Sequence, residues 1–430
     1  MALTPTQRLQ ALADPASVLE IAGAARSQQP AVAAETPRDG VLTAFATIGG
    51  QRAAVIVEDA DALACTDAEV ARRKRHRILT LALMTDSPIV LVVDGSRAGS
   101  STFGDNTGEL AGRMSDPRLD VDIGRRRAPL ITVVCGAVVA WARDVVADAD
   151  VVIATEAAQR ELADRSRGIV DVVVTDDNAA MAAARTLLSL LGPHVAGEGT
   201  VRFAPTPLPA GPEPVDSGLM ADPARVVDLL VDAGSFVAFQ RPDGSGLLTG
   251  VARIGGWPVV LAVTGGADSA QLTSLDLARL LRVYRLAGRN NRTLAVVQDC
   301  VGYAPDAAAD LAGLAALVGE IRACDAPVVT IVSGRGHTLG TFPLGTKQLG
   351  ATFIIAWPWA QLAITDARAY TPEALDEVRR PDPWLAAGRG LVDDVLTPAE
   401  TVQTVRQLVA LFGERWERVT RRDRPNAVIV

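Results

Sequence analysis

Apolar and polar residues follow the same order of patterns in the two halves of the chain. Residues 41–59 and 246–265 each consist of two β-branched runs separated by a pair of glycines, which predicts a hairpin. Residues 69–85 and 274–289 come next, with apolar positions at the spacing of a helix. Each half therefore opens with two paired strands and a helix.

Short apolar runs then alternate with further helical segments. The first runs end at Asp94 and Asp299, and the others are residues 129–136, 151–155, 327–334 and 353–358. Strands that alternate with helices form βαβ units, in which helices cover a sheet of parallel strands. The pattern predicts an α/β fold in both halves.

Four short motifs occur once in each half and in the same order, which indicates an internal duplication. The pairs are Asp14-Pro15-Ala16 with Asp222-Pro223-Ala224, Ile48-Gly49-Gly50 with Ile254-Gly255-Gly256, VLVVD with LAVVQD, and PLITVVCG with PVVTIVSG. Residues 193–218 are rich in Pro and Gly, as linkers are. We expect an N-terminal domain at 1–195, a linker at 196–220 and a C-terminal domain at 221–430.

Composition excludes several classes of protein. Hydrophobic residues are 49% of the 430 residues, so the chain can bury a core and is not intrinsically disordered. The net charge of −8 disfavours a nucleic-acid partner, which needs a basic surface. No run of about 18 apolar residues and no signal peptide is present, so we expect a cytoplasmic protein with no membrane segment. The four cysteines and three histidines are scattered, so we expect neither a disulfide framework nor a metal site.

The strands that end in glycine turns are the candidate positions of an active site. GRGHTLG, residues 334–340, follows a strand, but its glycine spacing does not match a dinucleotide fingerprint. No P-loop and no Gly-x-Ser-x-Gly motif occurs. A strand–glycine–helix turn can instead direct backbone N–H groups at an oxyanion. Two similar halves would supply two such turns, which suits chemistry on two carbonyl groups.

The segment LGTKQLGATFIIAWPWAQLAI, residues 344–364, closely resembles the second half of acyl-CoA carboxylase carboxyltransferase β-subunits. QDCVGYAPD (298–306) is similar to that family's Asp-Val-Pro-Gly-Phe motif, and residues 69–90 resemble its first-half helix without a gap. Only two of the 42 basic residues are lysines, Lys74 and Lys347, and both fall on lysines of the family.

The resemblance implies two tandem crotonase-like domains built from ββα repeats. In this family, carboxybiotin gives its carboxyl group to the α-carbon of an acyl-CoA. The resemblance implies that backbone amides near Ala140 and Trp141 face the enolate. It also implies that the amides of Leu339 and Gly340 polarise the biotin carbonyl.

The resemblance extends to other binding residues and to partners. Lys74 and Lys347 would supply positive charge for phosphates or for positioning, unless they are solvated surface lysines. The other residues on family motifs that would bind CoA or biotin are Gly136, Gly302, Tyr303, His337 and Gly345. The biotin is carried by a separate biotinylated carboxylase or carrier subunit. We therefore expect a homo- or hetero-oligomer that binds acyl-CoA and uses biotin without a metal.

The chain departs from the family at the glycine motifs, and this leaves two alternatives open. Ala140 and Trp141 replace the first-half glycine pair, and the second-half Gly-Gly-Ala becomes Thr338-Leu339-Gly340. One alternative is a catalytically weak structural subunit of a carboxylase complex. The other is a biotin-independent decarboxylase of malonyl-type thioesters, which needs a single oxyanion site.

Substituting Trp141 tests whether its ring narrows the first-half pocket. If the ring fills space that the thioester needs, Trp141→Gly should cost little stability and should strengthen acyl-CoA binding in a calorimetric titration. If the ring is buried in the core instead, truncation should lower the free energy of unfolding by about 3–5 kcal/mol. Unchanged acyl-CoA affinity in a well-folded variant would contradict the hypothesis that the Trp141 ring narrows the pocket.

Overall fold

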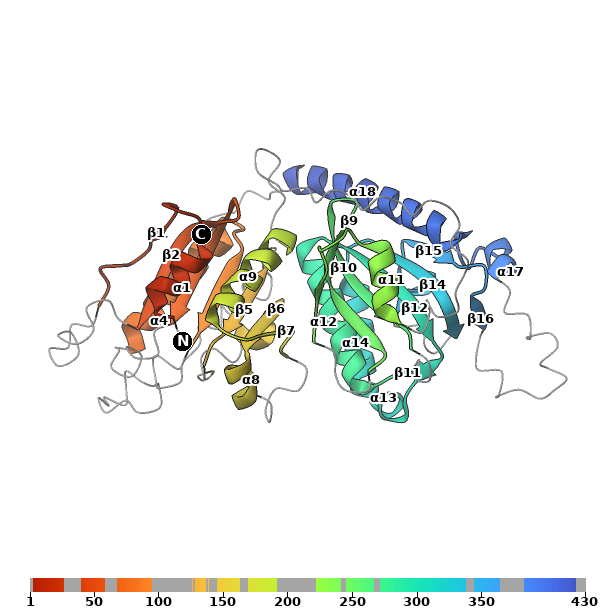
Figure 1. The fold of residues 1–430 in the computed structure, drawn as a ribbon, viewed down its shortest axis with the longest axis horizontal. Helices are drawn as coiled ribbons and strands as arrows, with labels where there is room; N and C mark the ends of the chain where they lie inside the picture. The colour runs from red at the N-terminus through yellow and green to blue at the C-terminus, as the bar shows by residue number, and fades with distance from the viewer. Residues whose placement is uncertain are drawn as a thin grey trace. The chain divides into compact units, whose positions relative to one another are not determined.

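The chain divides into two compact units, Met1–Thr200 with Ala427–Val430, and Val201–Asn426 (Figure 1). The structure is a computed structural model, and each unit is described by itself. The described residues are 3–26, 40–58, 68–94, 126, 128–136, 138, 145–162, 169–191, 222–240, 245–266, 271–337, 344–363 and 383–422. The boundary between the units falls within the Pro- and Gly-rich stretch.

The first unit is built on a sheet whose described strands run in chain order. They are β1 (Leu19–Glu20), β2 (Val41–Ile48), β3 (Gln51–Glu58), β4 (Ile89–Val93), β5 (Leu130–Val134), β6 (Val151–Thr155) and β7 (Val172–Val174). Pairing is antiparallel from β1 to β3 and parallel from β3 to β7. The hairpin and the strands expected from the sequence are therefore confirmed.

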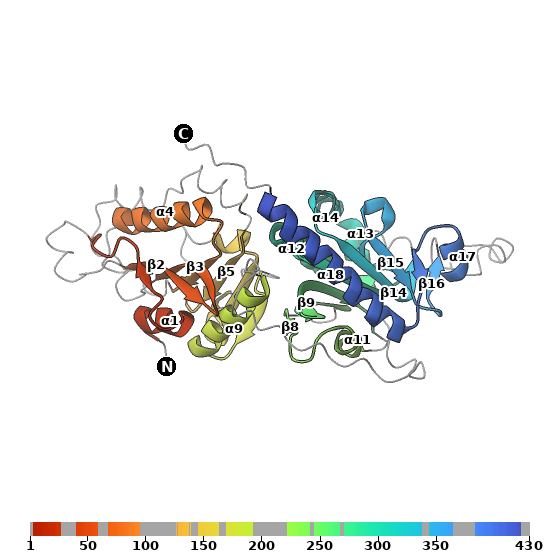
Figure 2. The same cartoon turned by 90° about the horizontal axis from the view of Figure 1, so that it is seen from above.

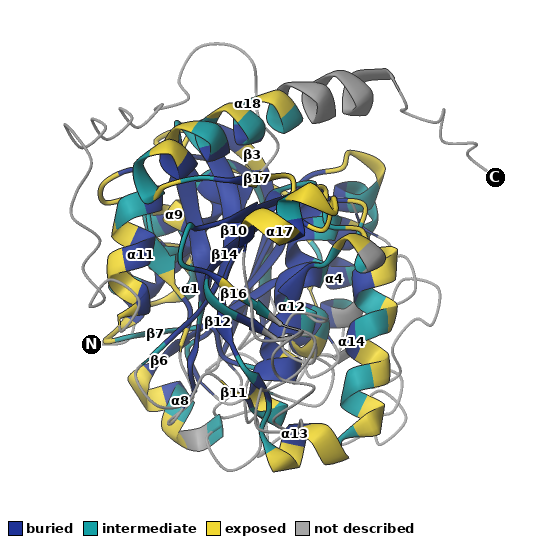
Figure 3. Cartoon of the chain, turned by 90° about the vertical axis from the view of Figure 1, so that its right-hand side faces the viewer, coloured by how far each residue is buried: buried dark blue, intermediate teal, exposed yellow. Residues whose placement is uncertain are grey.

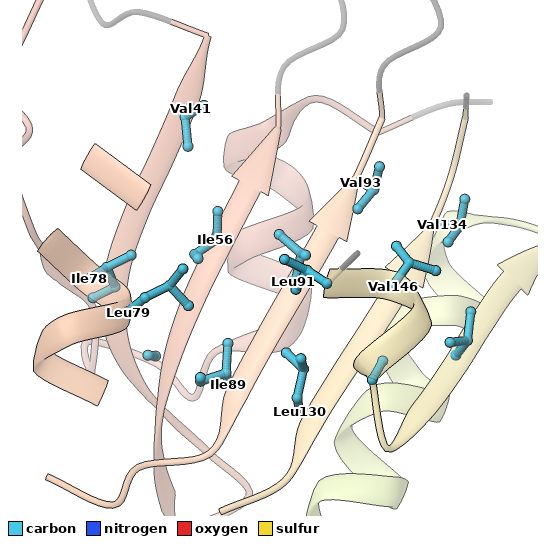
Figure 4. Close-up of a cluster of buried hydrophobic side chains, with 14 of the residues drawn as sticks. Val41, Ile56, Ile78, Leu79, Ile89, Leu91, Val93, Leu130, Val134 and Val146 are labelled. Carbon is cyan, nitrogen blue, oxygen red and sulfur yellow. The ribbon is translucent and has the colours of Figure 1, made fainter. Parts of the chain in front are cut away.

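Helices cover both faces of this sheet, as Figure 2 shows for α4 on one side and α1 and α9 on the other. The described helices are α1 (Pro5–Leu12), α4 (Ala68–Met84), α8 (Glu156–Leu162) and α9 (Asp177–Leu191). Every residue of β4, β5 and β6 is buried, as in parallel sheets covered on both faces. Figure 4 shows Ile78 and Leu79 of α4 packed on strand residues such as Ile56 and Ile89.

The second unit contains a sheet in the order β17-β15-β14-β12-β10-β9-β8, with β16 also paired to β14. The strands are β8 (Val237–Ala238), β9 (Leu247–Ile254), β10 (Trp257–Thr264), β12 (Thr293–Cys300), β14 (Val328–His337), β15 (Phe353–Ala356), β16 (Gln361–Ala363) and β17 (Asp394–Val395). A separate pair joins β11 (Gln271–Leu272) to β13 (Gly302–Tyr303).

Helices of the second unit bury the apolar strands in the same manner. They are α11 (Pro223–Leu230), α12 (Ser274–Asn290), α13 (Pro305–Ala309), α14 (Leu311–Ala323), α17 (Pro383–Gly388) and α18 (Pro398–Arg422). Apolar side chains of α11 and α18 pack on Val297, Val329 and Ile331 in one core cluster. Figure 3 shows buried residues concentrated in the strands and exposed ones on the outer faces of the helices. The α/β fold predicted from the sequence is thus confirmed.

The two sheets share one order of strands. In both units a short strand pairs with a hairpin, and parallel strands follow from the second strand of that hairpin. Val92 in β4 and Val296 in β12 accordingly occupy the fourth strand from the same edge. The hairpins turn at Gly49–Gly50 and Gly255–Gly256, where all four φ angles are positive, from 57° to 83°. Glycine adopts this region without the steric cost that other residues meet there.

One motif pair proposed from the sequence is wrong. Asp222 is the N-cap of α11 and accepts from the Ala224 N–H, so its counterpart is Thr4, the N-cap of α1. The structural counterpart of Asp14 is Asp232. Both carboxylates follow the first helix of their unit and accept from both N–H groups of the glycine turn, at 2.9–3.0 Å for Asp14 and 2.6–3.0 Å for Asp232.

A serine three residues later completes this turn in each unit. The hydroxyls of Ser17 and Ser235 donate to the carbonyls of Asp14 and Asp232 at 2.7 Å and accept from the first hairpin strand. The Asp-Pro-Ala sequence at residues 14–16 and 222–224 is identical, but it occupies different structural positions in the two units. The shared hydrogen bonds of an Asp-x-x-Ser turn are visible only once the chain is folded.

We expect the two aspartates of the second unit to differ in their contribution to stability. Asp232→Ala should lower the free energy of unfolding by about 2–4 kcal/mol, because it leaves two backbone N–H groups without acceptors. Asp222→Ala removes a single cap and should cost about 1 kcal/mol. Urea titrations of both variants measure the difference. A loss at Asp222 as large as that at Asp232 would contradict the assignment.

Candidate active site at the carboxyl ends of the strands

Strands β12 and β14 end in an irregularity that exposes polar groups at the edge of the second sheet. Between Gln298 and Cys300 of β12, the paired position on β14 moves from Val332 to Gly336. Extra residues on β14, Ser333 to Arg335, form a β-bulge there. Bulges re-aim side chains and are frequent beside active sites. The bulge follows the buried part of the strand, so polar side chains gather where the sheet ends.

The bulge directs Arg335 onto Asp299. The Arg335 guanidinium binds both carboxylate oxygens, at 2.7 Å and 2.9 Å, and its backbone N–H donates to the same carboxylate at 2.7 Å. The Asp299 side chain is 7% exposed and that of Arg335 is 30% exposed. Such a bidentate pair holds both strand ends in one fixed geometry. Neither residue was singled out as a site residue from the sequence.

Gln298 is a third polar side chain at this edge that was not predicted from the sequence. It is fully buried, and neither its amide oxygen nor its amide nitrogen has a hydrogen-bond partner among the described residues. Its Nε2 lies 3.6 Å from the position that a Cβ on Gly336 would occupy. The only signal in the sequence is an amide at the end of an apolar run, TLAVVQ.

Three residues expected to bind CoA or biotin lie at the same edge. Gly302 and Tyr303 form β13 immediately after β12, and His337 is the last residue of β14, paired with Ala363. Tyr303 is half-buried, and burial raises its pKa to about 12, so its hydroxyl stays protonated and can donate a hydrogen bond. The structure thus brings Tyr303 and the Asp299–Arg335 pair to the carboxyl ends of neighbouring strands.

The equivalent edge of the first unit carries charges that are already paired. Arg8 of α1 binds Asp94, which follows β4, at 2.7 Å and Asp177 of α9 at 2.9 Å. Arg75 of α4 binds Glu58 at 2.9 Å. Because the arginines come from helices on opposite faces of the sheet, they fasten both helical layers to the strand ends. Gly136, a candidate from the sequence, is buried just after β5 at this edge.

The two lysines have different surroundings. Lys74 is 2% exposed within α4, so it is not a solvated surface lysine. Lys347 is exposed and donates at 2.9 Å to both the carbonyl of Gly390 and the carboxylate of Asp393. Asp393 also accepts from the Ile354 N–H at 2.8 Å. Lys347 therefore binds the segment after α17, and Asp393 of that segment bonds β15.

Gly345 brings the segment before Lys347 directly against β14. Its carbonyl accepts from the Thr330 hydroxyl at 2.9 Å. A Cβ at Gly345 would lie 2.6 Å from that hydroxyl oxygen, which no side chain tolerates without a shift. Four predicted catalytic positions, Ala140, Trp141, Leu339 and Gly340, lie outside the described residues.

The described thiols are unsuited to nucleophilic catalysis. Burial raises the pKa of Cys300, at the end of β12, to about 12, and it also raises the pKa of Cys135, just after β5, well above its usual range. Cys324, between α14 and β14, has its pKa raised by burial to about 11. A raised pKa keeps the thiol protonated, whereas the thiolate is the nucleophile.

The described part of the chain contains no cluster of three His, Cys, Asp or Glu side chains that could hold a metal ion. Among the helices of the described residues, none has the length and apolar character needed to cross a membrane.

Comparisons with known proteins place the fold. A solved structure of transcarboxylase 12S matches with a TM-score of 0.79 at 20% identity, covering 96% of this chain and 90% of that one. A single-chain, multi-domain long-chain acyl-CoA carboxylase matches with a TM-score of 0.74 at 22% identity, covering 95% of this chain and 47% of that one. The chain therefore has the fold of transcarboxylase 12S.

Sequence relatives agree with the resemblance stated from the residues. Residues 161–372 match the carboxyl transferase domain. The methylmalonyl-CoA carboxyltransferase 12S subunit of Propionibacterium freudenreichii is 23% identical, over 96% of this chain and 89% of that protein. The biotin-dependent long-chain acyl-CoA carboxylase beta4 subunit of Mycobacterium tuberculosis is 26% identical, over 96% and 90%. These matches confirm the resemblance of this chain to the carboxyltransferase β-subunits of acyl-CoA carboxylases.

We expect the native thiols to resist alkylation. At pH 8 a pKa of about 12 leaves roughly one Cys300 in ten thousand as thiolate, against about a quarter of unperturbed cysteines. Iodoacetamide labelling followed by mass spectrometry should therefore modify Cys300 at least a hundredfold faster in urea than in the native protein. Rapid native labelling at pH 8 would contradict the raised pKa.

Proposed function

We propose that this chain is the carboxyltransferase subunit of a biotin-dependent acyl-CoA carboxylase and moves a carboxyl group from carboxybiotin to an acyl-CoA. The observation that carries the proposal is the likeness to the 12S subunit along nearly the whole of both chains, in sequence and in fold. The match to the carboxyl transferase domain supports it independently. Biotin, carried by a partner protein, supplies an activated carboxyl group when bound.

Each unit contributes one site in this proposal. In the first unit, backbone amides near Ala140 and Trp141 would stabilise the enolate of the acyl thioester. In the second unit, the amides of Leu339 and Gly340 polarise the ureido carbonyl. No protein nucleophile takes part, in agreement with the protonated state of the buried thiols.

Described residues of the second unit supply polar groups at the edge where the proposal puts biotin. The Asp299–Arg335 pair joins the ends of β12 and β14 at the bulge. Tyr303 remains protonated and can donate to an acceptor at the same edge.

The shared order of strands and the two Asp-x-x-Ser turns support the origin of both units by internal duplication. We propose accordingly that residues 1–195 form an acyl-CoA domain and residues 221–430 a biotin domain, with a connecting linker between them. An oligomer is part of the proposal, because a transcarboxylase 12S structure is described as a hexamer assembly. The partner would be a biotinylated carboxylase or carrier subunit.

Transfer of labelled carboxyl groups tests the proposal. The protein is mixed with a carrier whose biotin is carboxylated with labelled carbon and with a panel of acyl-CoAs. We expect label in at least one acyl-CoA. Leu339→Pro, which deletes one amide N–H, should lower kcat by about 10²–10³-fold, whereas Leu339→Ala keeps that amide and should retain most of the activity.

Two other outcomes would contradict this function. CO₂ release from malonyl-type thioesters without biotin would favour a decarboxylase; one relative of that kind, the methylmalonyl-CoA decarboxylase subunit alpha of Propionigenium modestum, is 24% identical over 42% of this chain and 40% of that protein. Absence of both activities, with the chain stably bound to an active carboxylase complex, would favour a structural subunit.

A further inference from the structure

The outer surface of α14 is far more apolar than a helix face in contact with water usually is. Only Leu317 and Ile321 of its 13 residues are buried. The exposed residues are Leu311, Ala312, Ala315, Ala316, Gly319, Arg322 and Ala323, and six of these seven carry no polar side chain. Leu311 is 74% exposed. Figure 3 shows α14 mostly in the colours of exposed and intermediate residues.

Other helices of the second unit present polar side chains to solvent. α11 exposes Arg225 and Asp228, and α18 exposes Gln403 and Gln407. A helix that is apolar around its whole circumference is normally buried. Apolar residues that gather on one part of a surface mark a place where another molecule binds. The composition of α14 therefore indicates a helix that is covered on its outer side as well.

The small exposed residues of α14 share one face. Those that lie within about 60° of one another around the helix are Ala312, Ala316, Gly319 and Ala323. The face they form is about 16 Å long, at about 1.5 Å per residue. Small side chains at a contact bring two helix axes to the short end of the usual range, about 8 Å. One helix of similar length can thus cover the whole face.

The two ends of this face differ in charge. Arg322 is the one charged residue among the exposed positions of α14, and it lies in the last turn. The first turn follows Asp310, whose carboxylate caps the helix by accepting from the Gly313 N–H at 2.8 Å. Asp306 of α13 is exposed near the same end. An antiparallel copy of α14 would bring each arginine to the acidic end of the other helix, whereas a parallel copy would bring the two arginines together.

We propose that the exposed face of α14 binds α14 of a second copy of this chain in an antiparallel pair. The inference rests on the oligomer of the proposed function and names a surface that forms it. A two-fold interface uses the same patch on both copies, so the patch must be complementary to itself. The face of α14 meets this condition, because it is apolar in the middle and opposite in charge at its ends. The two-fold axis passes between Ala316 and Gly319, at the middle of the face.

A charge placed in the middle of the face tests the interface. Ala316→Glu should raise the dissociation constant of the assembly by about 100-fold, because the pair would bury two like charges. Light scattering across a dilution series measures this, and the wild type should have a mass that is a multiple of 44.9 kDa. Ala182→Glu is the matched control, because Ala182 is an exposed alanine of α9 in the first unit. The control should associate as the wild type does.

Cysteine cross-linking tests the antiparallel arrangement. A Cβ at Gly319 would meet no atom within 4 Å, so the chain tolerates Gly319→Cys. Next to the axis, the two copies of residue 319 come within the Cα separation of a disulfide, about 4.4–6.8 Å. Mild oxidation should therefore give a covalent dimer on a non-reducing gel. Ala312→Cys is the control, because its two copies lie about 16 Å apart along an antiparallel pair.

The outcomes separate this inference from the proposed function. An oligomer that Ala316→Glu leaves intact would overturn the inference and preserve the oligomer. Equal cross-linking of Ala312→Cys and Gly319→Cys would overturn the antiparallel pair. A monomeric wild type in which a biotinylated carrier protects Gly319→Cys from alkylation would also overturn the inference and would make the carrier the partner of this face. Labelled-carboxyl transfer by the wild type would preserve the catalytic proposal in each case.

Discussion

Burial of the central strands on both faces is the constraint on which the rest of the structure depends. β4, β5, β6 and β12 contain buried residues at every position, so a polar side chain without a partner inside them costs stability. Polar groups are accordingly concentrated at the carboxyl ends of the strands. Ligands of open α/β sheets bind at this edge.

The two edges satisfy this constraint differently. In the first unit, Arg8 is buried and reaches the described strand ends from a helix. In the second unit, Arg335 comes from the bulge of β14 and is partly exposed. The arginine of the second edge therefore lies closer to solvent than that of the first.

The glycine turns of the two hairpins are held by the same hydrogen bonds, although the residues between the bonding side chains differ. The carboxylates of Asp14 and Asp232 each accept hydrogen bonds from the two N–H groups of a glycine turn. The hydroxyls of Ser17 and Ser235 donate to the backbone carbonyls of these aspartates. The residues between differ, Pro15-Ala16 against Ala233-Gly234, but Ala16 and Gly234 share a positive φ, 57° and 71°. The hydrogen bonds are common to both units, whereas the intervening side chains are not.

Much of the fold is determined by local pattern, because hairpin glycines, helical spacing and buried apolar runs act within short stretches of chain. The predicted strands at 151–155 and around 89–94 agree with the structure for this reason. The resemblance to carboxyltransferase β-subunits also rests on a contiguous segment, residues 344–364. Only the tertiary structure decided the partners of polar groups. The Asp299–Arg335 pair depends on a bulge between two strands, the Arg8–Asp94 pair joins residues far apart in sequence, and the isolation of the Gln298 amide depends on neighbours from three strands. Such contacts are set by how elements pack, which no short segment encodes by itself.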